Sequence, residues 1–197
     1  MNSIPPNEYF RKFLHLFSSI IPLGYFLFFP KRGSMVLILG GLSFLAVLIE
    51  YSRRNWSAIE TSFEKYFNFM MRQNEFEGTI TGATWLLFGS TLTILLFPIH
   101  IAVPALLFLT VGDTFAAIVG KSIPIGKIGE KSLSGTFAGI VTSSGVALMI
   151  NQIIPSEIII FGAVVAMVVE ILPIPMNDNL TIPLAGGLTM HYGMMTL

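Results

Sequence analysis

The stretch IAVPALLFLTVGDTFAAIVG, which runs from Ile101 to Gly120, decides the fold class of this chain. It is long enough to cross a bilayer as an α-helix, which needs about 20 predominantly apolar residues. It carries one charged side chain, Asp113, in the second half of the run. The run therefore predicts a membrane-spanning helix, and the carboxylate inside it indicates a functional site, because an ionisable group in a membrane span is costly.

The composition of the whole chain agrees with a membrane protein. The 197 residues are 53% hydrophobic and only 11% charged, with a mean hydropathy of +0.76, whereas ordinary soluble domains are about 25% charged. This excludes a soluble enzyme and a disordered regulator. The net charge is zero, so we expect no nucleic-acid partner. The absence of cysteine excludes disulfides, thiolate catalysis and cysteine-ligated metals.

Further apolar runs predict an all-α, polytopic bundle of about seven transmembrane helices, which forms a single integral-membrane domain over residues 1–197. We interpret the first run as a retained span rather than a cleaved signal peptide, because Lys31 and Arg32 follow it in place of a small-residue cleavage site. The expected spans are Phe13–Phe29, Met35–Tyr51, Gly82–Phe97, Ile101–Val119, Gly135–Ile154, Ile158–Leu172 and Leu180–Leu197.

The Lys and Arg residues predict the orientation of these spans. With seven spans, the side that holds the N-terminus carries all of the 11 Lys and Arg residues except Lys31 and Arg32. Cytoplasmic loops carry the excess of Lys and Arg, so we expect a cytoplasmic N-terminus and, in a prokaryote, the plasma (inner) membrane. The residues on the cytoplasmic side are Arg11, Lys12, Arg53, Arg54, Lys65, Arg72, Lys121, Lys127 and Lys131.

The longest polar segment, residues 52–77, predicts an amphipathic helix that lies in the membrane interface. Simple anchoring is the plainer interpretation of such a segment. Its large apolar side chains recur at helical spacing, and they are Trp56, Ile59, Phe63, Phe67 and Met70.

Polar residues gather near the cytoplasmic ends of the predicted spans. A charge near the centre of a span costs at least about 2.5–3.5 kcal/mol, so such residues usually have a function. A cluster at one face favours an enzyme that takes a soluble reagent from the cytoplasm and a lipid from the bilayer. A channel or transporter would distribute polar groups through the membrane. The residues are His15, Glu50, Glu77, Asp113, Glu170, Asp178 and Asn179.

Several of these features also have a structural interpretation. Glu50 can pair with Arg53 or Arg54, which follow it by three and four residues. His15 can be an interfacial residue that hydrogen-bonds to the backbone. Small residues at a spacing of four also predict close helix packing on their own, and they are Gly112, Ala116, Gly120, Gly135 and Gly139.

The loop after the fourth span reads GKSIPIGKIGEKSLSG over residues 120–135. Glycines let backbone N–H groups approach phosphate oxygens, lysines supply positive charge, and the N-terminus of the following helix attracts anions. It is not a Walker loop, because Phe115 occupies the position of the first glycine. With Asp113 beside it, the segment 112–135 predicts a nucleotide-binding region, since phosphoryl transfer needs a carboxylate-held cation near the phosphates. The alternative is a positively charged anchor.

Three motifs lie in order along the chain. The first is RKFLH, from Arg11 to His15. The second is GDTFA, from Gly112 to Ala116, which is followed by Gly120 and by Lys131, Ser132 and Gly135. The third is Glu170 followed by NDNLTIP, from Asn177 to Pro183. Together they resemble the signatures of the phytol, dolichol and other polyprenol kinases, a family that includes the yeast-type CTP-dependent diacylglycerol kinase.

The resemblance implies a kinase that transfers the terminal phosphate of a nucleoside triphosphate, CTP in many members, to the hydroxyl of a membrane lipid alcohol. The acceptor would be an isoprenoid alcohol or diacylglycerol, and the site would face the cytoplasm. We expect Mg²⁺ as the cofactor, held by Asp113, Glu170 and Asp178. We expect the catalytic groups to be Asp113, His15 and Asp178. We expect the nucleotide to contact Arg11, Lys12, Gly120, Lys121, Lys127, Lys131, Ser132, Gly135 and Asn179.

Two other functions remain open at this point. A related cytidylyltransferase would make a CDP-lipid from a phosphorylated lipid, and a permease or scaffold would consume no nucleotide. The proton acceptor is either His15 or one of the carboxylates. The choice between CTP and ATP, the identity of the lipid alcohol and the oligomeric state, a homodimer included, are also open.

Overall fold

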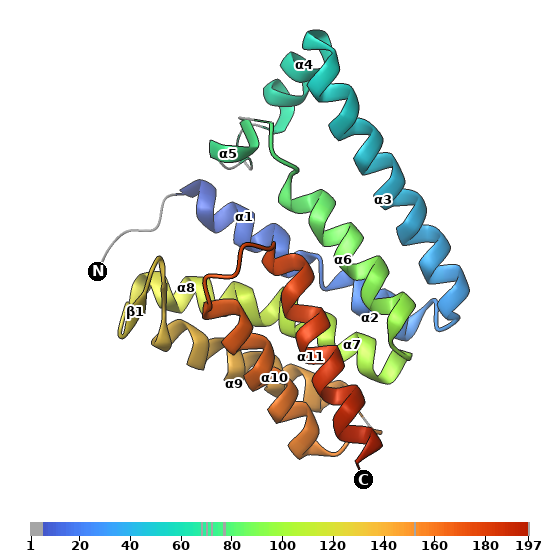
Figure 1. The fold of residues 1–197 in the computed structure, drawn as a ribbon, viewed down its shortest axis with the longest axis vertical. Coiled ribbons are helices and arrows are strands. Elements are labelled where there is room, and N and C mark those ends of the chain that lie inside the picture. Colours follow the sequence, from blue (N-terminus) through green and yellow to red (C-terminus); the bar gives the residue numbers. More distant parts are fainter. Residues whose placement is uncertain are drawn as a thin grey trace.

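The computed structural model describes residues 6–67, 69, 71, 73–76, 78–151 and 153–196, which form a helical bundle with one small β-hairpin (Figure 1). The predicted all-α class is confirmed, and Met70, Arg72 and Glu77 lie outside the described residues. The elements are α1 (Pro6–Phe17), α2 (Ile20–Leu27), α3 (Arg32–Asn55), α4 (Ser57–Phe67), α5 (Gln73–Phe76), α6 (Gly82–Leu96), α7 (Ile99–Leu107), a π-helical segment (Phe108–Asp113), α8 (Thr114–Ser122), β1 (Lys127–Ile128), β2 (Lys131–Ser132), α9 (Leu133–Ile150), α10 (Ser156–Ile171) and α11 (Asp178–Met195).

Within the described part of the chain, three helices are long and apolar enough to cross a membrane. They are Arg32–Asn55, the continuous helix Ile99–Ser122, and Leu133–Ile150. The outer face of α3 is strongly apolar, since Leu37 is 78% exposed and Phe44 is 64% exposed. A continuous apolar surface of this kind is unfavourable in water and suits contact with lipid, so the structure is compatible with a membrane protein.

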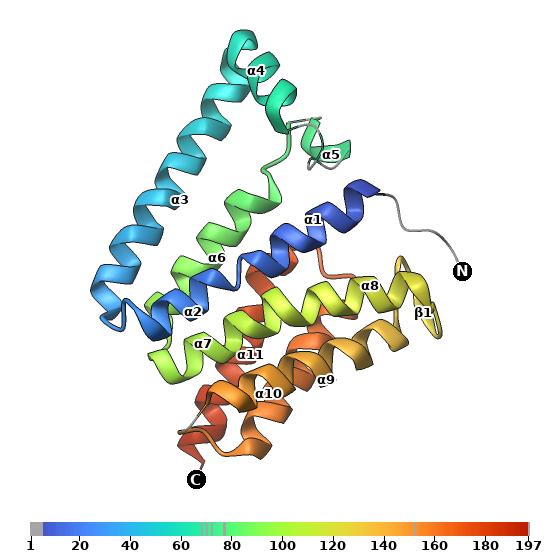
Figure 2. The same ribbon diagram turned by 180° about the vertical axis from the view of Figure 1, so that it is seen from behind.

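The core of the bundle surrounds the middle helix, which consists of α7, the π segment and α8. Every residue from 101 to 114 is buried. The helices α1, α2, α9, α10 and α11 pack against this middle helix. Figure 2 shows α7 and α8 running between α1 and α2 on one side and α9 and α10 on the other. The one charged residue in the buried stretch, Asp113, therefore lies inside the protein.

The prediction of one continuous helix over Phe13–Phe29 was wrong, because α1 and α2 divide this run. The chain breaks between α1 and α2 at two serines. The Ser18 hydroxyl donates to the carbonyl oxygen of His15, and the Ser19 hydroxyl donates to Thr110 Oγ1 at 2.7 Å. Serine hydroxyls compete for hydrogen bonds that otherwise continue a helix, so the run forms two short helices.

The polar segment 52–77 also differs from a single helix. The helix α3 continues to Asn55, α4 follows it, and α5 is only one turn long. In α4, Phe67 is 42% exposed and Ile59 is 37% exposed, while Phe63 is partly buried. This helix has the expected amphipathic pattern, and its location in the membrane interface remains a prediction.

The loop between α8 and α9 contains a β-hairpin that the sequence did not indicate. The antiparallel strands pair Lys127 with Ser132 and Ile128 with Lys131. Gly129 turns the chain with a φ of 61°, a left-handed conformation that glycine adopts without steric cost. The hairpin holds Lys131 at the point where the chain enters α9.

The backbones of α8 and α9 approach closely beside this hairpin. A Cβ atom on Gly135 would lie 2.3 Å from the carbonyl oxygen of Ala116 and 3.0 Å from Cα of Gly120. Because even a methyl group does not fit, Gly120 and Gly135 pack two helices together. This close packing agrees with the structural interpretation of their spacing, and their expected contact with a nucleotide stays a prediction.

We expect Gly135→Ala to lower the free energy of unfolding by about 1–3 kcal/mol, because the added methyl group overpacks the contact. Gly145→Ala in the same helix is the matched control, since a Cβ there meets nothing within 4 Å. Alanine is also the better helix former, by about 1 kcal/mol. Thermal unfolding in detergent measures both variants, and equal midpoints for the two would contradict this packing.

Candidate active site

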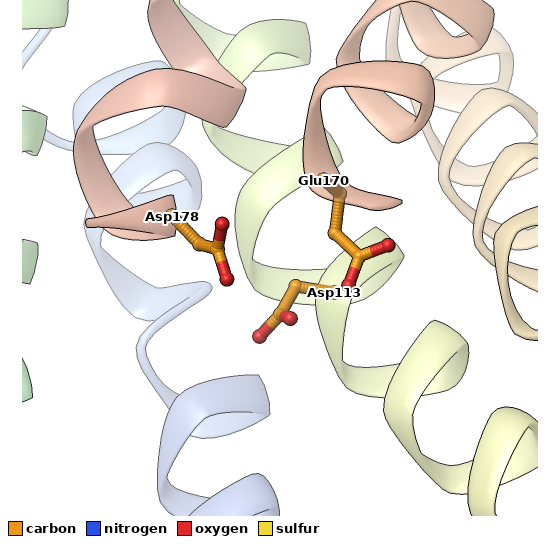
Figure 3. Close-up of side chains that lie close together, drawn as sticks. All are labelled: Asp113, Glu170 and Asp178. Carbon is orange, nitrogen blue, oxygen red and sulfur yellow. The ribbon is translucent and has the colours of Figure 1, made fainter. Parts of the chain in front are cut away.

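Three carboxylates from three helical segments meet at one end of the bundle. Oxygen atoms of Asp113, Glu170 and Asp178 all lie within 4.8 Å of one another. Figure 3 shows their side chains pointing toward a common centre. The structure thus brings together the three residues expected to hold a metal ion, although more than 60 positions of sequence separate the first from the last.

Local structure explains how each carboxylate reaches this point. Asp113 is the last residue of the π segment, and π turns inside α-helices are frequent at functional sites. Glu170 lies in the last turn of α10, and Asp178 begins α11. The connection between these two helices contains Pro173 and Pro175, which prevent α10 from continuing. A short link therefore returns the chain to the same end of the bundle.

The cluster has a buried part and an open part. The side chains of Glu170 and Asp113 are 6% and 13% exposed, whereas the Asp178 side chain is 38% exposed. The Asn177 side chain caps α11 by accepting from the backbone N–H of Asn179 at 3.0 Å, which fixes the start of the helix that carries Asp178. A soluble ligand can therefore reach the carboxylates from the Asp178 side.

Lys131 extends from the hairpin into this cluster. Its Nζ lies 3.0 Å from Asp178 Oδ2 and 3.2 Å from Glu170 Oε1, and it also donates to the backbone carbonyl of Glu170. Burial lowers the pKa of Lys131, but the charges of Asp178 and Glu170 outweigh burial and raise the pKa above its ordinary value. The lysine is therefore a positive charge held beside two carboxylates.

Lys12 and His15 of α1 contact the third carboxylate. Lys12 Nζ donates to Asp113 Oδ2 at 2.7 Å, and His15 Nε2 lies 3.3 Å from the same oxygen. Lys12 is only 6% exposed, so this ion pair is buried. With Lys131, two ammonium groups therefore lie beside the three carboxylates.

Arg11 and Lys121 are tied to a residue that the sequence analysis did not select. Both place a nitrogen 2.7 Å from Glu8 Oε1. Burial raises the pKa of Glu8, but the hydrogen bond from Lys121 and the charge of Arg11 outweigh it and hold the pKa below its ordinary value. The spacing of three residues between Glu8 and Arg11 was a signal for this pair. Glu8 therefore links α1 to the end of α8.

The remaining residues that we expected to contact the nucleotide lie outside the carboxylate cluster. The Ser132 hydroxyl caps α9 by accepting from the backbone N–H of Gly135 at 3.3 Å. The Asn179 side chain donates to the carbonyl oxygen of Gly82 at 2.9 Å and joins the starts of α11 and α6. Lys127 is exposed on β1 and forms no ion pair with a carboxylate of the described residues. Of the hairpin lysines, Lys131 is the one that enters the cluster.

Glu50 belongs to a separate, structural group. Arg53 donates to Glu50 Oε2 at 2.7 Å, as the spacing in the sequence allowed, and the two residues are 4% and 6% exposed. Arg53 also donates to the carbonyl oxygens of Glu75 and Thr79. Glu50 accepts from the backbone N–H of Thr81 at 2.8 Å. These bonds attach the segment before α6 to the end of α3.

Arg53→Ala is expected to lower the free energy of unfolding by about 3–5 kcal/mol, because it leaves the Glu50 carboxylate buried without its counter-charge. Arg54→Ala is the matched control, since Arg54 is the next residue and is exposed. Thermal unfolding in detergent compares the two. If both variants unfold like the unaltered protein, the pair does not stabilise the fold.

Comparisons with known proteins add one relative. No family model and no solved structure matches the chain. An uncharacterized protein of Rickettsia prowazekii is 28% identical over 183 residues, which cover 89% of each chain. The similarity extends over nearly the full length of both proteins, so it concerns the whole chain rather than a single motif.

Proposed function

We propose that this protein is an integral-membrane lipid kinase, which transfers the terminal phosphate of a nucleoside triphosphate to the hydroxyl of a membrane lipid alcohol. The observation that carries the proposal is the meeting of Asp113, Glu170 and Asp178 beside Lys131. Phosphoryl transfer depends mainly on positioning and on neutralising charge, and this cluster offers both cation ligands and a fixed positive charge. The motif resemblance favours CTP as the donor.

The three carboxylates fit a magnesium ion by their chemistry. They offer only oxygen ligands, their oxygens lie within 4.8 Å of one another, and Asp178 leaves one side open for water and phosphate oxygens. Mg²⁺ prefers oxygen ligands and usually keeps several waters. When bound, the ion would neutralise charge on the phosphates of the donor. Lys131 would neutralise the phosphate that is transferred.

His15 is the group that we propose to accept the proton of the alcohol, because its Nε2 lies 3.3 Å from Asp113 Oδ2 and it lines a cavity beside the carboxylate cluster. The lipid oxygen forms a bond to the terminal phosphorus, the bond from that phosphorus to the bridging oxygen breaks, and the nucleoside diphosphate leaves. His15→Gln is expected to lower kcat about 100-fold, since general bases contribute roughly that much. Nucleotide affinity, measured in parallel, should stay constant. An unchanged kcat would remove His15 from this role.

The membrane arrangement belongs to the same proposal. We propose about seven passes, a cytoplasmic N-terminus, and α4 in the interface, in the plasma membrane of a prokaryote. The uneven distribution of Lys and Arg supports this orientation, because positive residues are enriched in cytoplasmic loops. The soluble nucleotide would then reach the cluster from the cytoplasm.

Labelled nucleotide tests the proposed function. Purified protein in detergent receives CTP or ATP labelled at the γ or the α phosphate, Mg²⁺ or a chelator, and a panel of prenols, fatty alcohols and diacylglycerol. A kinase moves the γ label into lipid and depends on Mg²⁺. Transfer of the α label to a phosphorylated lipid would instead identify a cytidylyltransferase, and unconsumed nucleotide would favour a permease or scaffold.

A further inference from the structure

A cavity of about 490 Å³ adjoins the carboxylate cluster on the side away from the hairpin. Residues of α1, α3, α4 and α6 and the start of α11 line it. Its volume is in the range of pockets that hold a small molecule, about 300–1,000 Å³. The cavity is therefore large enough for a small molecule in addition to a cation held by the carboxylates.

The lining of this cavity divides into two parts. At one end lie the charged groups Arg11, Lys12, His15, Asp113 and Asp178. The remaining wall is largely apolar, and its main side chains are Leu14, Ile49, Phe63, Phe67 and Leu87. Such a cavity suits a molecule with a polar head and a hydrocarbon body, because each part would meet a matching surface.

Two acidic residues in the wall, Glu50 and Glu75, do not make it a site for a charged ligand. Glu50 already accepts from Arg53 and from Thr81, and Glu75 accepts from the backbone N–H of Gly82 at 2.9 Å. Such hydrogen bonds satisfy these two carboxylates within the protein. The polar end of the cavity is therefore the one formed by the charged groups beside Asp113.

The rim of the cavity is open to the surroundings of the protein. Ile49 lines the cavity and is still 49% exposed, and Phe67 lines it and is 42% exposed. Ile49 belongs to α3, one of the helices long and apolar enough to cross a membrane. A hydrocarbon chain can therefore leave the cavity past apolar side chains, without burial of its full length inside the protein.

We infer that this cavity binds the hydrocarbon chain of the acceptor alcohol, with the hydroxyl directed toward Asp113 and Asp178. The donor phosphates would approach the cluster from the other side, where Lys131 enters from the hairpin. This inference rests on the proposed kinase function and adds the location of the acceptor. The two substrates meet at the carboxylates from opposite sides, as transfer between them requires.

Filling the cavity tests this inference. Ala46 of α3 lines the cavity, and Ala46→Phe would occupy part of it. We expect at least a tenfold higher KM for a long-chain alcohol, with an unchanged Kd for nucleotide. The matched control is Val47→Phe, because the next residue is 50% exposed and does not line the cavity. Ala83→Leu, on the α6 wall, is a second cavity variant in case the first does not fold.

Photo-crosslinking of the unaltered protein gives a second measurement that needs no catalysis. A long-chain alcohol with a diazirine in its chain should label peptides that contain Ile49, Phe63 or Leu87. Labelling of these peptides without phosphate transfer to any alcohol would contradict the kinase proposal, but it would still support the cavity as a binding site for the alcohol. Three results would overturn the cavity inference. They are phosphate transfer with labelling elsewhere in the protein, an unchanged KM for the alcohol in both cavity variants, and a raised Kd for the nucleotide in those variants.

Discussion

Asp113→Asn is expected to lower kcat about a thousandfold, which corresponds to about 4 kcal/mol of transition-state stabilisation. The amide keeps the shape of the side chain and removes its charge. Asp113 is the carboxylate that contacts both Lys12 and His15, and it lies in the buried stretch of the middle helix. Its loss should therefore weaken the cation site and the position of His15 together. Initial rates with labelled nucleotide and a lipid alcohol measure the change.

Two further variants separate this effect from damage to the fold. Asp113→Asn leaves the buried Lys12 ammonium without its partner, so the double variant Lys12→Met/Asp113→Asn removes both charges. We expect the double variant to regain stability and to remain inactive. Glu157→Gln is the matched control for loss of a carboxylate, since Glu157 is exposed in the first turn of α10. Turnover by Asp113→Asn at the rate of Glu157→Gln would exclude Asp113 from the mechanism.

Lys131→Met should lower kcat/KM for the nucleotide about 100- to 1,000-fold, because it removes the positive charge that we propose to neutralise the transferred phosphate. Lys127→Met is the matched control, since both lysines lie on the same hairpin and only Lys131 contacts Glu170 and Asp178. The control should stay within about threefold of the unaltered protein, as expected for an exposed charge. Steady-state kinetics with varied nucleotide give both values.

The conservative variant Lys131→Arg distinguishes a catalytic from a structural lysine. It keeps the charge and should recover part of kcat/KM, whereas Lys131→Met should not. Thermal unfolding of both variants shows how much Lys131 contributes to the fold through Glu170 and Asp178. Equal losses of kcat/KM in Lys127→Met and Lys131→Met would mean that the hairpin contributes only general positive charge.

Much of the helical arrangement was predictable because apolar runs and breakers mark helix ends. The run Gly82–Phe97 differs from α6 by one residue, and α10 and α11 begin within about two residues of their predicted starts. The exceptional cost of a charge inside an apolar run also identified Asp113. These features are local, so they can be recognised in the sequence without knowledge of the fold.

Other features depend on contacts between distant parts of the chain. The break at Ser19 involves Thr110, and the tie between Asn179 and Gly82 joins α11 to α6. The π segment leaves the apolar pattern unchanged, so periodicity gives no signal for it. Glu8 was missed although its spacing of three residues from Arg11 was a signal for that pair, and no pattern in the sequence indicated its contact with Lys121 of α8. Which lysine of the hairpin enters the cluster is decided by the strand pairing.

Binding of Mn²⁺ in place of Mg²⁺ tests most directly the central claim that Asp113, Glu170 and Asp178 form one cation site. Electron paramagnetic resonance of purified protein with a non-hydrolysable CTP analogue measures the bound ion. We predict one Mn²⁺ per chain in the unaltered protein and in Glu157→Gln, and none in the triple variant Asp113→Asn/Glu170→Gln/Asp178→Asn. Retention of the bound ion by the triple variant, or no bound ion in the unaltered protein, would contradict the claim.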